Sequence, residues 1–524
     1  MTTHVIETPS QLPLENSLPA FHRNLDDLIT DNARQRPSAV AFIDAEGSVN
    51  WLQLELQVKV IAERLQAAGL NRGDRVGFLV SNSIQAYCAI FGAMRAGAVI
   101  VPFSTMLADK DIATLIDDAT CRAIYVGPEL MPLADQALGN LNRERRPSLL
   151  ALDSEAEPVL AVATDPADAN QGICSIIYSS GTTGLPKGAV HSHSARICAG
   201  LMSATGFRYG AESVSLLSTP PYTNGSWMMV LPALVTGSTV VLMKNFDLSN
   251  FFALTERHKP THAFIVPTQF QMIVEYPEYT PSLFDSFECM ITAGAPMPPT
   301  LKQQVMADAP GRLYELWGLT EVVATVITPE QMQEKADSVG RALPLSEIRL
   351  IGEDDREVNL PGTGEIVARS AYQMMGYWNR AEQNADIQWT ADDGSTFMRT
   401  GDIGEIDEQG FLYIRGRVKD MIISGGINVF PVDIENVLRN HPALQDATVI
   451  GVPHQKWGET PVAYVRCNGN SNLDKQELLE WANDRLSKFQ RLSDIVLFLS
   501  DFPRNTLGKV LKNELRSLYR APDQ

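Results

Sequence analysis

The sequence predicts an α/β protein built from several packed units, and two observations carry that prediction. Amphipathic segments alternate with short apolar runs: apolar residues recur at helical spacing from Leu52 to Leu65, Gly69 follows as a stop, and Arg75–Val80 has the composition of a buried strand. Such alternation is typical of parallel strands joined by helices. The second observation is length, because 524 residues exceed what one hydrophobic core ordinarily organises.

The first two thirds of the chain repeat this alternation. Helix and strand alternate from Asn24 to Gly97, and a polar, proline-bearing stretch at 154–170 is expected to be a surface connection. Further strands are expected at Ile173–Tyr178, Ser238–Met243, His262–Val266 and Cys289–Ala293. We therefore expect two α/β subdomains in this part of the chain.

The pattern changes after Leu345 to short alternating strands and tight turns. Strands are expected at Ile348–Ile351, Gly364–Ala368 and Phe411–Ile414, with a hairpin turn at 407–410. Beyond Arg417 come a glycine-rich loop, a helix at Val432–Asn440, a strand at Ala447–Val452, a helix at Lys475–Lys488 and a final basic loop. The sequence thus predicts a β-rich subdomain followed by a small C-terminal α/β domain.

Composition excludes several classes of protein. Hydrophobic residues make up 44% and charged residues 20%, as in an average folded enzyme, while the formal charge of −19 would repel nucleic acid and anionic lipid. Six scattered cysteines predict neither a zinc knuckle nor a disulfide framework. We see no leader pattern and no apolar run of membrane-spanning length, so we expect a cytoplasmic protein that acts on small molecules, with no nucleic-acid or integral-membrane role.

A loop rich in glycine and hydroxyl groups directly follows the strand at 173–178. Glycines let backbone N–H groups approach an anion, hydroxyls add donors and a lysine adds charge, so the loop predicts a polyphosphate cradle. It is not a Walker A loop, because no Ser or Thr follows the Gly-Lys pair. The candidate phosphate-binding residues are Ser179, Ser180, Gly181, Thr182, Thr183, Gly184 and Lys187.

This loop resembles the phosphate-binding motif of the adenylate-forming superfamily, which includes acyl-CoA synthetases, luciferases and nonribosomal adenylation domains. Two further segments match in the same order: 292–296 resembles the segment beside the adenine, and 314–321 resembles the next core motif. The resemblance implies that Trp317 stacks on the adenine, that Thr320 touches the α-phosphate and that Glu321 helps to hold Mg²⁺. The nucleotide-binding residues that it adds are Gly294, Ala295, Pro296, Glu315, Leu316, Trp317, Gly318 and Thr320.

Later motifs continue the resemblance. Asp402, in Arg-Thr-Gly-Asp, corresponds to the aspartate that binds the ribose hydroxyls, which suits a carboxylate with two acceptor oxygens. The resemblance also assigns Ile414 and Arg417 to the nucleotide and Lys419 to a hinge. It therefore divides the chain into an adenylation domain at 1–418 and a small mobile lid domain at 419–524.

Two lid motifs complete the set. The glycine-rich turn Ser424, Gly425 and Gly426 corresponds to a CoA channel, where missing side chains admit a narrow thiol arm. Lys509, in the C-terminal loop, corresponds to the adenylation lysine, whose ammonium can stabilise charge that grows on the phosphoryl oxygens and on pyrophosphate. The catalytic residues expected from the resemblance are Lys509, Glu321, Thr320 and Lys187.

The acyl pocket is less clearly marked. Thr223 occupies the place where many relatives have histidine, and Trp227 falls near a gating tryptophan of some long-chain ligases, although a core tryptophan fits equally. The candidate pocket residues are Tyr222, Thr223, Trp227, Pro267 and Gly318, with Met228, Met229, Val266 and Phe270 either lining it or packing in the core. His191 and His193 lack a third zinc ligand and are expected to cap or orient the phosphate loop.

The resemblance implies a carboxylic acid:CoA ligase that uses ATP, Mg²⁺ and coenzyme A on an apolar acid, whether medium- or long-chain, cyclic or aryl. An acyl-AMP ligase that loads an acyl-carrier protein is an alternative, because it shares the first half-reaction. A catalytically silent nucleotide-binding homologue is another, which the presence of Lys509, Glu321 and Lys187 argues against. Relatives also give the expectation of a homodimer.

Overall fold

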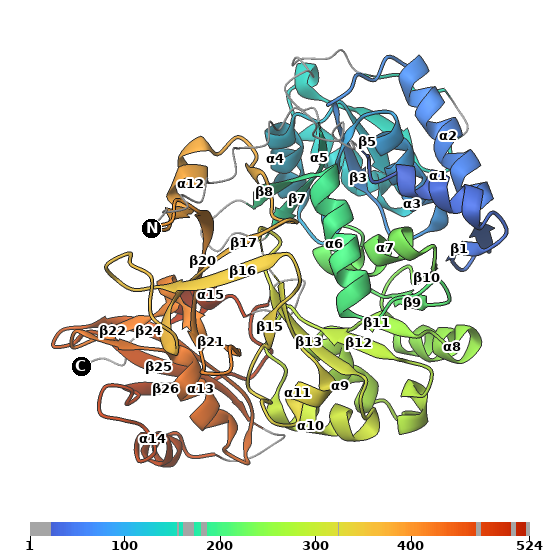
Figure 1. Cartoon of the computed structure of the whole chain (residues 1–524). Coiled ribbons are helices and arrows are strands. Elements are labelled where there is room, and N and C mark those ends of the chain that lie inside the picture. The colour runs from blue at the N-terminus through green and yellow to red at the C-terminus, as the bar shows by residue number, and fades with distance from the viewer. Residues whose placement is uncertain are drawn as a thin grey trace, which may run out of the picture.

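Four β-sheets organise the chain in the computed structural model, which describes residues 23–154, 157–160, 172–179, 186–322, 324–467, 473–504 and 510–519. Figure 1 shows two large sheets with their helices, a β-rich part beside them, and the C-terminal domain below it. The predicted architecture is confirmed: two α/β subdomains, a β-rich subdomain and a smaller α/β domain.

The first large sheet has seven strands in the order β18-β8-β7-β4-β3-β5-β6. Its strands β3 to β7 pair in parallel, while β7 and β8 form an antiparallel hairpin around the predicted phosphate loop. The strands are β3 Arg75–Leu79, β4 Val99–Pro102, β5 Ala123–Val126, β6 Ser148–Ala151, β7 Ile173–Ser179, β8 Lys187–Ser192 and β18 Gly376–Tyr377. Its helices are α2 Trp51–Ala67, α3 Ile84–Arg95, α4 Asp109–Ala119 and α5 Met131–Gly139.

The second large sheet has nine strands in the order β15-β14-β13-β12-β11-β9-β10-β1-β2, with parallel pairing from β1 through β13. The strands are β1 Val40–Ile43, β2 Ser48–Asn50, β9 Val214–Leu217, β10 Thr239–Leu242, β11 His262–Phe264, β12 Cys289–Thr292, β13 Leu313–Gly318, β14 Ala324–Ile327 and β15 Arg341–Ala342. The helices of this half are α1 Asp27–Gln35, α6 His193–Gly206, α7 Asn224–Thr236, α8 Leu248–His258, α9 Pro267–Val274, α10 Pro299–Asp308 and α11 Pro329–Met332.

One apolar core joins the two large sheets. It contains Phe78 from the first sheet, Leu242 from the second, and residues of α6 and α7. Figure 1 shows α6 and α7 side by side between the sheets, and their residues are in extensive contact. The two α/β subdomains are therefore held together by buried apolar surface.

The β-rich subdomain is a five-stranded antiparallel sheet. The predicted turn at 407–410 is confirmed, since Gly410 N–H donates to the carbonyl of Asp407, and the Asp407 carboxylate accepts from the N–H groups of Gln409 and Phe411. The elements are β16 Ser346–Ile351, β17 Gly362–Ser370, β19 Gln388–Thr390, β20 Thr396–Ile406, β21 Leu412–Arg417 and the helix α12 Ala381–Asp386.

The C-terminal domain, which we call the lid, is a second five-stranded sheet with three helices. The helix predicted to reach Lys488 ends at Asn483, because the Asn483 side chain bonds the backbone N–H and carbonyl of Leu492 and turns the chain. The final loop contains a short helix. The elements are β22 Ile422–Ser424, β23 Ile427–Val429, β24 Leu444–His454, β25 Gly458–Cys467, β26 Asp494–Leu497, α13 Pro431–Arg439, α14 Lys475–Asn483 and α15 Lys512–Leu518.

Within the described residues, no helix combines the length and the apolar character needed to cross a membrane.

Candidate active site

The nucleotide motifs meet at one edge of the second large sheet. β12 and β13 are parallel neighbours, with Thr292 opposite Glu315. The turn that begins at Gly294 and the turn that carries Thr320 and Glu321 therefore leave the carboxyl ends of adjacent strands, where open α/β sheets bind ligands. Gly294 has φ +92°, a conformation that favours glycine and brings the backbone close to whatever occupies this edge.

Lys187 and Glu321 come together through a residue that sequence analysis missed. The Lys187 Nζ lies 5.0 Å from the ring centroid of Tyr377, and the Tyr377 hydroxyl donates to Glu321 Oε1 at 3.1 Å. Pairing of β18 with β8 places Tyr377 opposite Ala189, two residues from the lysine. Burial and the Glu321 charge raise the pKa of Tyr377, so its phenol stays protonated and donates.

The residues at the end of β13 differ in their surroundings. Trp317 is half-buried and packs against two small apolar clusters of the β-rich subdomain. Glu315 is buried and forms an ion pair with Lys302, and burial raises its pKa although the lysine opposes that shift. Its carboxylate therefore ties β13 to α10, which carries Lys302. Leu316 packs against the main core, and Gly318 is exposed at the strand end.

The candidate ribose residues lie opposite one another on the β-rich sheet. Asp402 on β20 pairs in register with Arg417 on β21, and Arg417 Nε lies 2.8 Å from Asp402 Oδ1. Asp402 is only 4% exposed. Ile414 is half-buried on β21 opposite Gly404.

The predicted hinge is a short 3₁₀ turn, Val418–Asp420, between β21 and the lid. Lys419 is exposed there, whereas Asp420 forms an ion pair with Arg516 of α15, with 2.9 Å between Asp420 Oδ1 and Arg516 Nη2. Burial alone would raise the pKa of Asp420, but Arg516, Lys512 and Lys419 outweigh it and the pKa is lowered. The Asp420 carboxylate is therefore ionised and connects the end of the turn to the lid.

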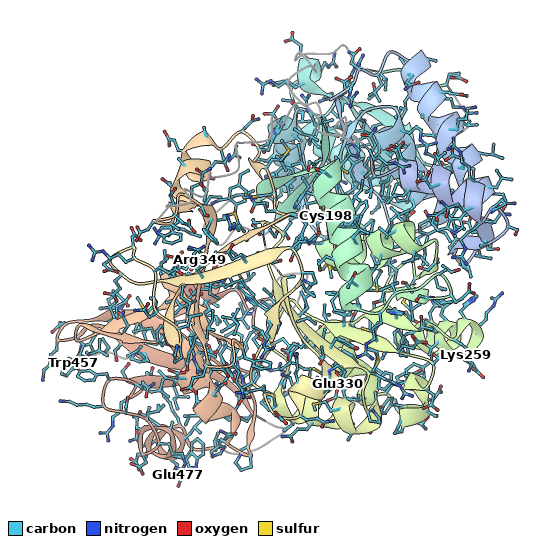
Figure 2. The ribbon with its side chains drawn as sticks, in the orientation of Figure 1. Cys198, Lys259, Glu330, Arg349, Trp457 and Glu477 are labelled. Atoms are coloured by element: carbon cyan, nitrogen blue, oxygen red, sulfur yellow. The ribbon has the colours of Figure 1, made fainter. Side chains whose placement is uncertain are left out.

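The predicted CoA-channel turn lies in the hairpin of β22 and β23. Gly425 and Gly426 have φ +61° and +80°, and Gly425 N–H donates to the carbonyl of Trp457 at 2.8 Å. Ser424 is buried beside them. Figure 2 labels Trp457 at the outer edge of the lid, on the side away from the large sheets. In this lid arrangement the turn is thus separated from the nucleotide residues.

The candidate acyl residues surround the start of α7 and α9. Thr223 caps α7 by accepting from Ser226 N–H, and Trp227 is 2% exposed, with its indole N–H donating to the Pro221 carbonyl at 3.2 Å. Tyr222 is buried, and Pro267 is the first residue of α9. Met229 and Phe270 are fully buried in two different cores, so the packing interpretation holds for both.

The two histidines after the phosphate loop have separate partners. His191 Nε2 lies 2.8 Å from the carbonyl oxygen of Thr320, whereas His193 Nδ1 accepts from Leu25 N–H at 3.0 Å. Among the described residues no group of three or more His, Cys, Asp or Glu could hold a metal. His191 therefore supports the turn that carries Thr320, which sequence analysis did not predict, and the expected contact with the phosphate loop concerns residues outside the described part of the chain.

Some predicted site residues lie outside the described part of the chain. These are Ser180, Gly181, Thr182, Thr183, Gly184 and Lys509, together with the side chain of Ser179.

Comparison with known proteins covers nearly the whole chain. The family model described as AMP-binding enzyme matches residues 29–378, and the AMP-binding enzyme C-terminal domain matches 433–509. The long-chain-fatty-acid–CoA ligase FadD13 of Mycobacterium tuberculosis is 32% identical over 95% of this chain and 99% of its own. The indoleacetate–CoA ligase of Aromatoleum aromaticum is 31% identical over 94% of this chain and 98% of its own.

A solved structure adds information on the domain arrangement. ATP-bound MatB from Rhodopseudomonas palustris superposes with a TM-score of 0.83 at 27% identity, covering 95% of this chain and 99% of that one. The apo structure of the same protein, with the same identity and coverage, gives a TM-score of 0.74. Over the whole chain, this structure is therefore more similar to the ATP-bound form than to the apo form.

Proposed function

The chain belongs to the family of AMP-binding enzymes, and from that premise we propose that it is an ATP-dependent carboxylic acid:CoA ligase. The observation that carries the proposal is the approach of β8 of the first large sheet to the turn after β13 of the second: Tyr377 links Lys187 to Glu321, and His191 contacts the Thr320 carbonyl. Relatives named as CoA ligases along almost the full chain support it. The products would be acyl-CoA, AMP and pyrophosphate.

In the first half-reaction a carboxylate oxygen of the acid attacks the α-phosphorus of ATP, and the bond to pyrophosphate breaks. Trp317 would hold the adenine, Asp402 and Arg417 the ribose, and Lys187 the phosphates. Lys509 would stabilise the charge that develops on the phosphoryl oxygens and the leaving group. These roles rest on the motif positions and on the neighbourhoods described above.

The surroundings of Glu321 fit a magnesium ion. It is a partly exposed carboxylate oriented by the Tyr377 hydroxyl and close to Lys187, and Mg²⁺ is ordinarily held by one or two carboxylates plus substrate phosphates. Glu321 would hold the ion, and the ion would neutralise phosphate charge.

In the second half-reaction the CoA sulfur attacks the acyl carbon, AMP leaves, and the thiol proton passes to solvent. Because the glycine turn at 424–426 is bonded to Trp457, which lies at the outer edge of the lid (Figure 2), the lid would rotate about Lys419 between the two steps. We propose the division at 418/419 on the same grounds. The greater similarity to ATP-bound MatB supports assigning the present arrangement to the nucleotide-binding step.

The acid is proposed to be apolar or aromatic. The named substrates of the two relatives, a long-chain fatty acid and indoleacetate, are both carboxylates with a large apolar part. The assignment of Tyr222 and Trp227 to the acyl pocket rests on their place in the sequence, because both side chains are buried and Trp227 packs in the main core.

Mass spectrometry tests the proposal directly. Purified protein is incubated with ATP, Mg²⁺ and a panel of short, medium, long, alicyclic and aromatic acids, each with and without CoA. Acyl-CoA together with AMP would support the ligase. Acyl-AMP that never passes to CoA would favour a carrier-protein acceptor instead, and the absence of both products across the panel would contradict the proposal.

The expected cytoplasmic location and the homodimer remain predictions. Cell fractionation tests the first, and light scattering on the eluted protein tests the second.

A further inference from the structure

A buried arginine lies between the acyl-side helix and the nucleotide turn. Arg196, on α6, is 4% exposed and receives no carboxylate within 4.0 Å from any described residue. Its partners are neutral: Asn224 Oδ1 at 2.8 Å, His191 Nδ1 at 3.3 Å, and Ser175 Oγ at 3.4 Å. Buried charges are normally paired with an opposite charge, so this one is unusual.

Burial of the Arg196 guanidinium without a carboxylate partner lowers the free energy of unfolding. Burial lowers its pKa to about 10, which still leaves it charged at neutral pH. Asn224 is the first residue of α7, and the N-terminal end of a helix carries partial positive charge that disfavours a cation. Stability alone therefore does not explain an arginine here.

The hydrogen bonds of His191 have one consistent assignment. The Thr320 carbonyl can only accept, so Nε2 carries the hydrogen and donates at 2.8 Å. Nδ1 is then an acceptor, which matches the guanidinium N–H that approaches it. Burial and the Arg196 charge lower the pKa of His191 well below its ordinary value, so the imidazole stays neutral in this tautomer.

These contacts form a continuous chain from one substrate region to the other. It begins at Asn224, beside the cap of α7 where the candidate acyl residues lie, and passes through Arg196 and His191 to the backbone of Thr320. The guanidinium also lies 5.8 Å from the ring centroid of Trp227. The two central side chains, Arg196 and His191, are buried, whereas Asn224 and Thr320 at the ends are half-buried. The series joins segments nearly a hundred residues apart.

We propose that His191 and Arg196 are positioning residues, which hold the Thr320–Glu321 turn in its nucleotide-binding geometry and tie it to the acyl-side helix α7. This rests on the proposed function for the identity of the ligand, ATP, and of the acid. Asn224 is bonded to Arg196, and the Thr320 carbonyl is bonded to His191. A displacement of α7 would therefore be transmitted to the Thr320 carbonyl through only two side chains, those of Arg196 and His191.

The test measures Mg·ATP affinity by titration calorimetry, which needs no knowledge of the acid. His191→Leu removes the donor to Thr320, whereas His191→Gln keeps an amide N–H that can donate and an oxygen that can accept from Arg196. The matched control is His262→Leu, because His262 is equally buried and its Nε2 lies 2.9 Å from a backbone carbonyl, that of Phe207, outside the site.

We expect His191→Leu to weaken ATP binding by about tenfold or more, as misplaced contacts do, while His191→Gln and His262→Leu stay within about threefold of wild type. Arg196→Met should weaken ATP binding as His191→Leu does, because it frees the imidazole. Equal affinities for His191→Leu and His262→Leu, or no rescue by glutamine, would overturn the proposal.

A second readout separates this inference from the proposed function. If wild-type protein binds Mg·ATP but adenylates no acid of the panel, the ligase proposal fails and the calorimetric comparison still decides the role of His191. Where an acid is found, ATP–pyrophosphate exchange per folded enzyme should fall in His191→Leu and recover in His191→Gln. Wild-type protein that binds no ATP would overturn both.

Discussion

Replacing Tyr377 by phenylalanine isolates one hydrogen bond at the candidate magnesium site. The substitution removes the hydroxyl that donates to Glu321 at 3.1 Å and keeps the ring that lies 5.0 Å from Lys187 Nζ. The backbone pairing of Tyr377 with Ala189 needs no side chain, so β18 should be retained. The expected result is a weaker interaction with Mg·ATP, because Glu321 loses the group that orients it.

The magnitude follows from the surroundings of the bond. A hydrogen bond to a charged group contributes about 1.5–3 kcal/mol, and water can replace part of it because Glu321 is only half-buried. A net loss of about 1–2 kcal/mol corresponds to a fall of about 5- to 30-fold in kcat/KM for ATP. Tyr377→Leu also removes the cation–π contact and should cost a further two- to fivefold or so.

The assay is ATP–pyrophosphate exchange over a series of Mg²⁺ concentrations with the best acid of the panel. Tyr279→Phe is the matched control, since its hydroxyl donates to the Asp308 carboxylate at 2.7 Å away from the site. If Tyr377→Phe stays within twofold of wild type at every Mg²⁺ concentration, or loses no more than the control, the orienting role is refuted.

Three other predictions concern the lid and the pH dependence. Lys509→Ala should abolish acyl-adenylate formation from ATP and largely spare thioester formation from supplied acyl-adenylate, measured as separate half-reactions; equal loss of both would refute the assignment. Gly426→Trp should block CoA turnover and leave adenylation mostly intact, since an added Cβ meets nothing within 4 Å and the strain of a side chain at φ +80° falls on the β22–β23 hairpin; unchanged CoA turnover would exclude the channel. Burial lowers the pKa of His191, His193 and His262, that of His193 to about 4. The unfolded chain therefore binds more protons below about pH 6.5, and the free energy of unfolding should fall between pH 6.5 and 5.5, by about 1 kcal/mol each for His191 and His193 and in the same direction for His262. Urea titrations at both pH values check this, with a shallower fall in His193→Gln, and an unfolding free energy that does not change with pH would contradict it.

Five strands of the two large sheets, β3, β7, β10, β11 and β12, were predicted, because each is a short apolar run that is mostly buried. All five residues of β3 and all four of β12 are buried, and such strands appear as short apolar runs in the sequence. β8 and α15 were missed for the opposite reason. β8 mixes Lys, His and Ser with small residues, and α15 is short and basic, held by ion pairs of Lys512 and Arg516 with lid carboxylates.

The site was predictable where its residues are contiguous and not where distant segments meet. The motif resemblance found Thr320, Glu321 and Lys187, each inside a recognisable run. Tyr377 bonds a residue 56 positions away, and no local pattern encodes that contact. Arg196 resembles an exposed helical charge in the sequence, because charged residues are almost always at the surface, and only the packing of α6 on α7 buries it.

The contacts on either side of the proposed hinge limit it to two residues. Arg417 is bound to Asp402 of the β-rich subdomain at 2.8 Å, and Asp420 is bound to Arg516 of the lid at 2.9 Å. Each end of the turn is thus anchored to a different domain. Only Val418 and Lys419, both exposed, remain between the two anchors to absorb a rotation.

The contacts between lid and body are of the kind that a rotation can break at little cost. No apolar cluster of described residues contains side chains from both domains. One contact that crosses is an exposed hydrogen bond, Asn428 to Glu353 at 2.6 Å, and exposed polar pairs contribute about 0–1 kcal/mol. Each domain therefore has its own core, which agrees with the proposed rotation of the lid between the two half-reactions.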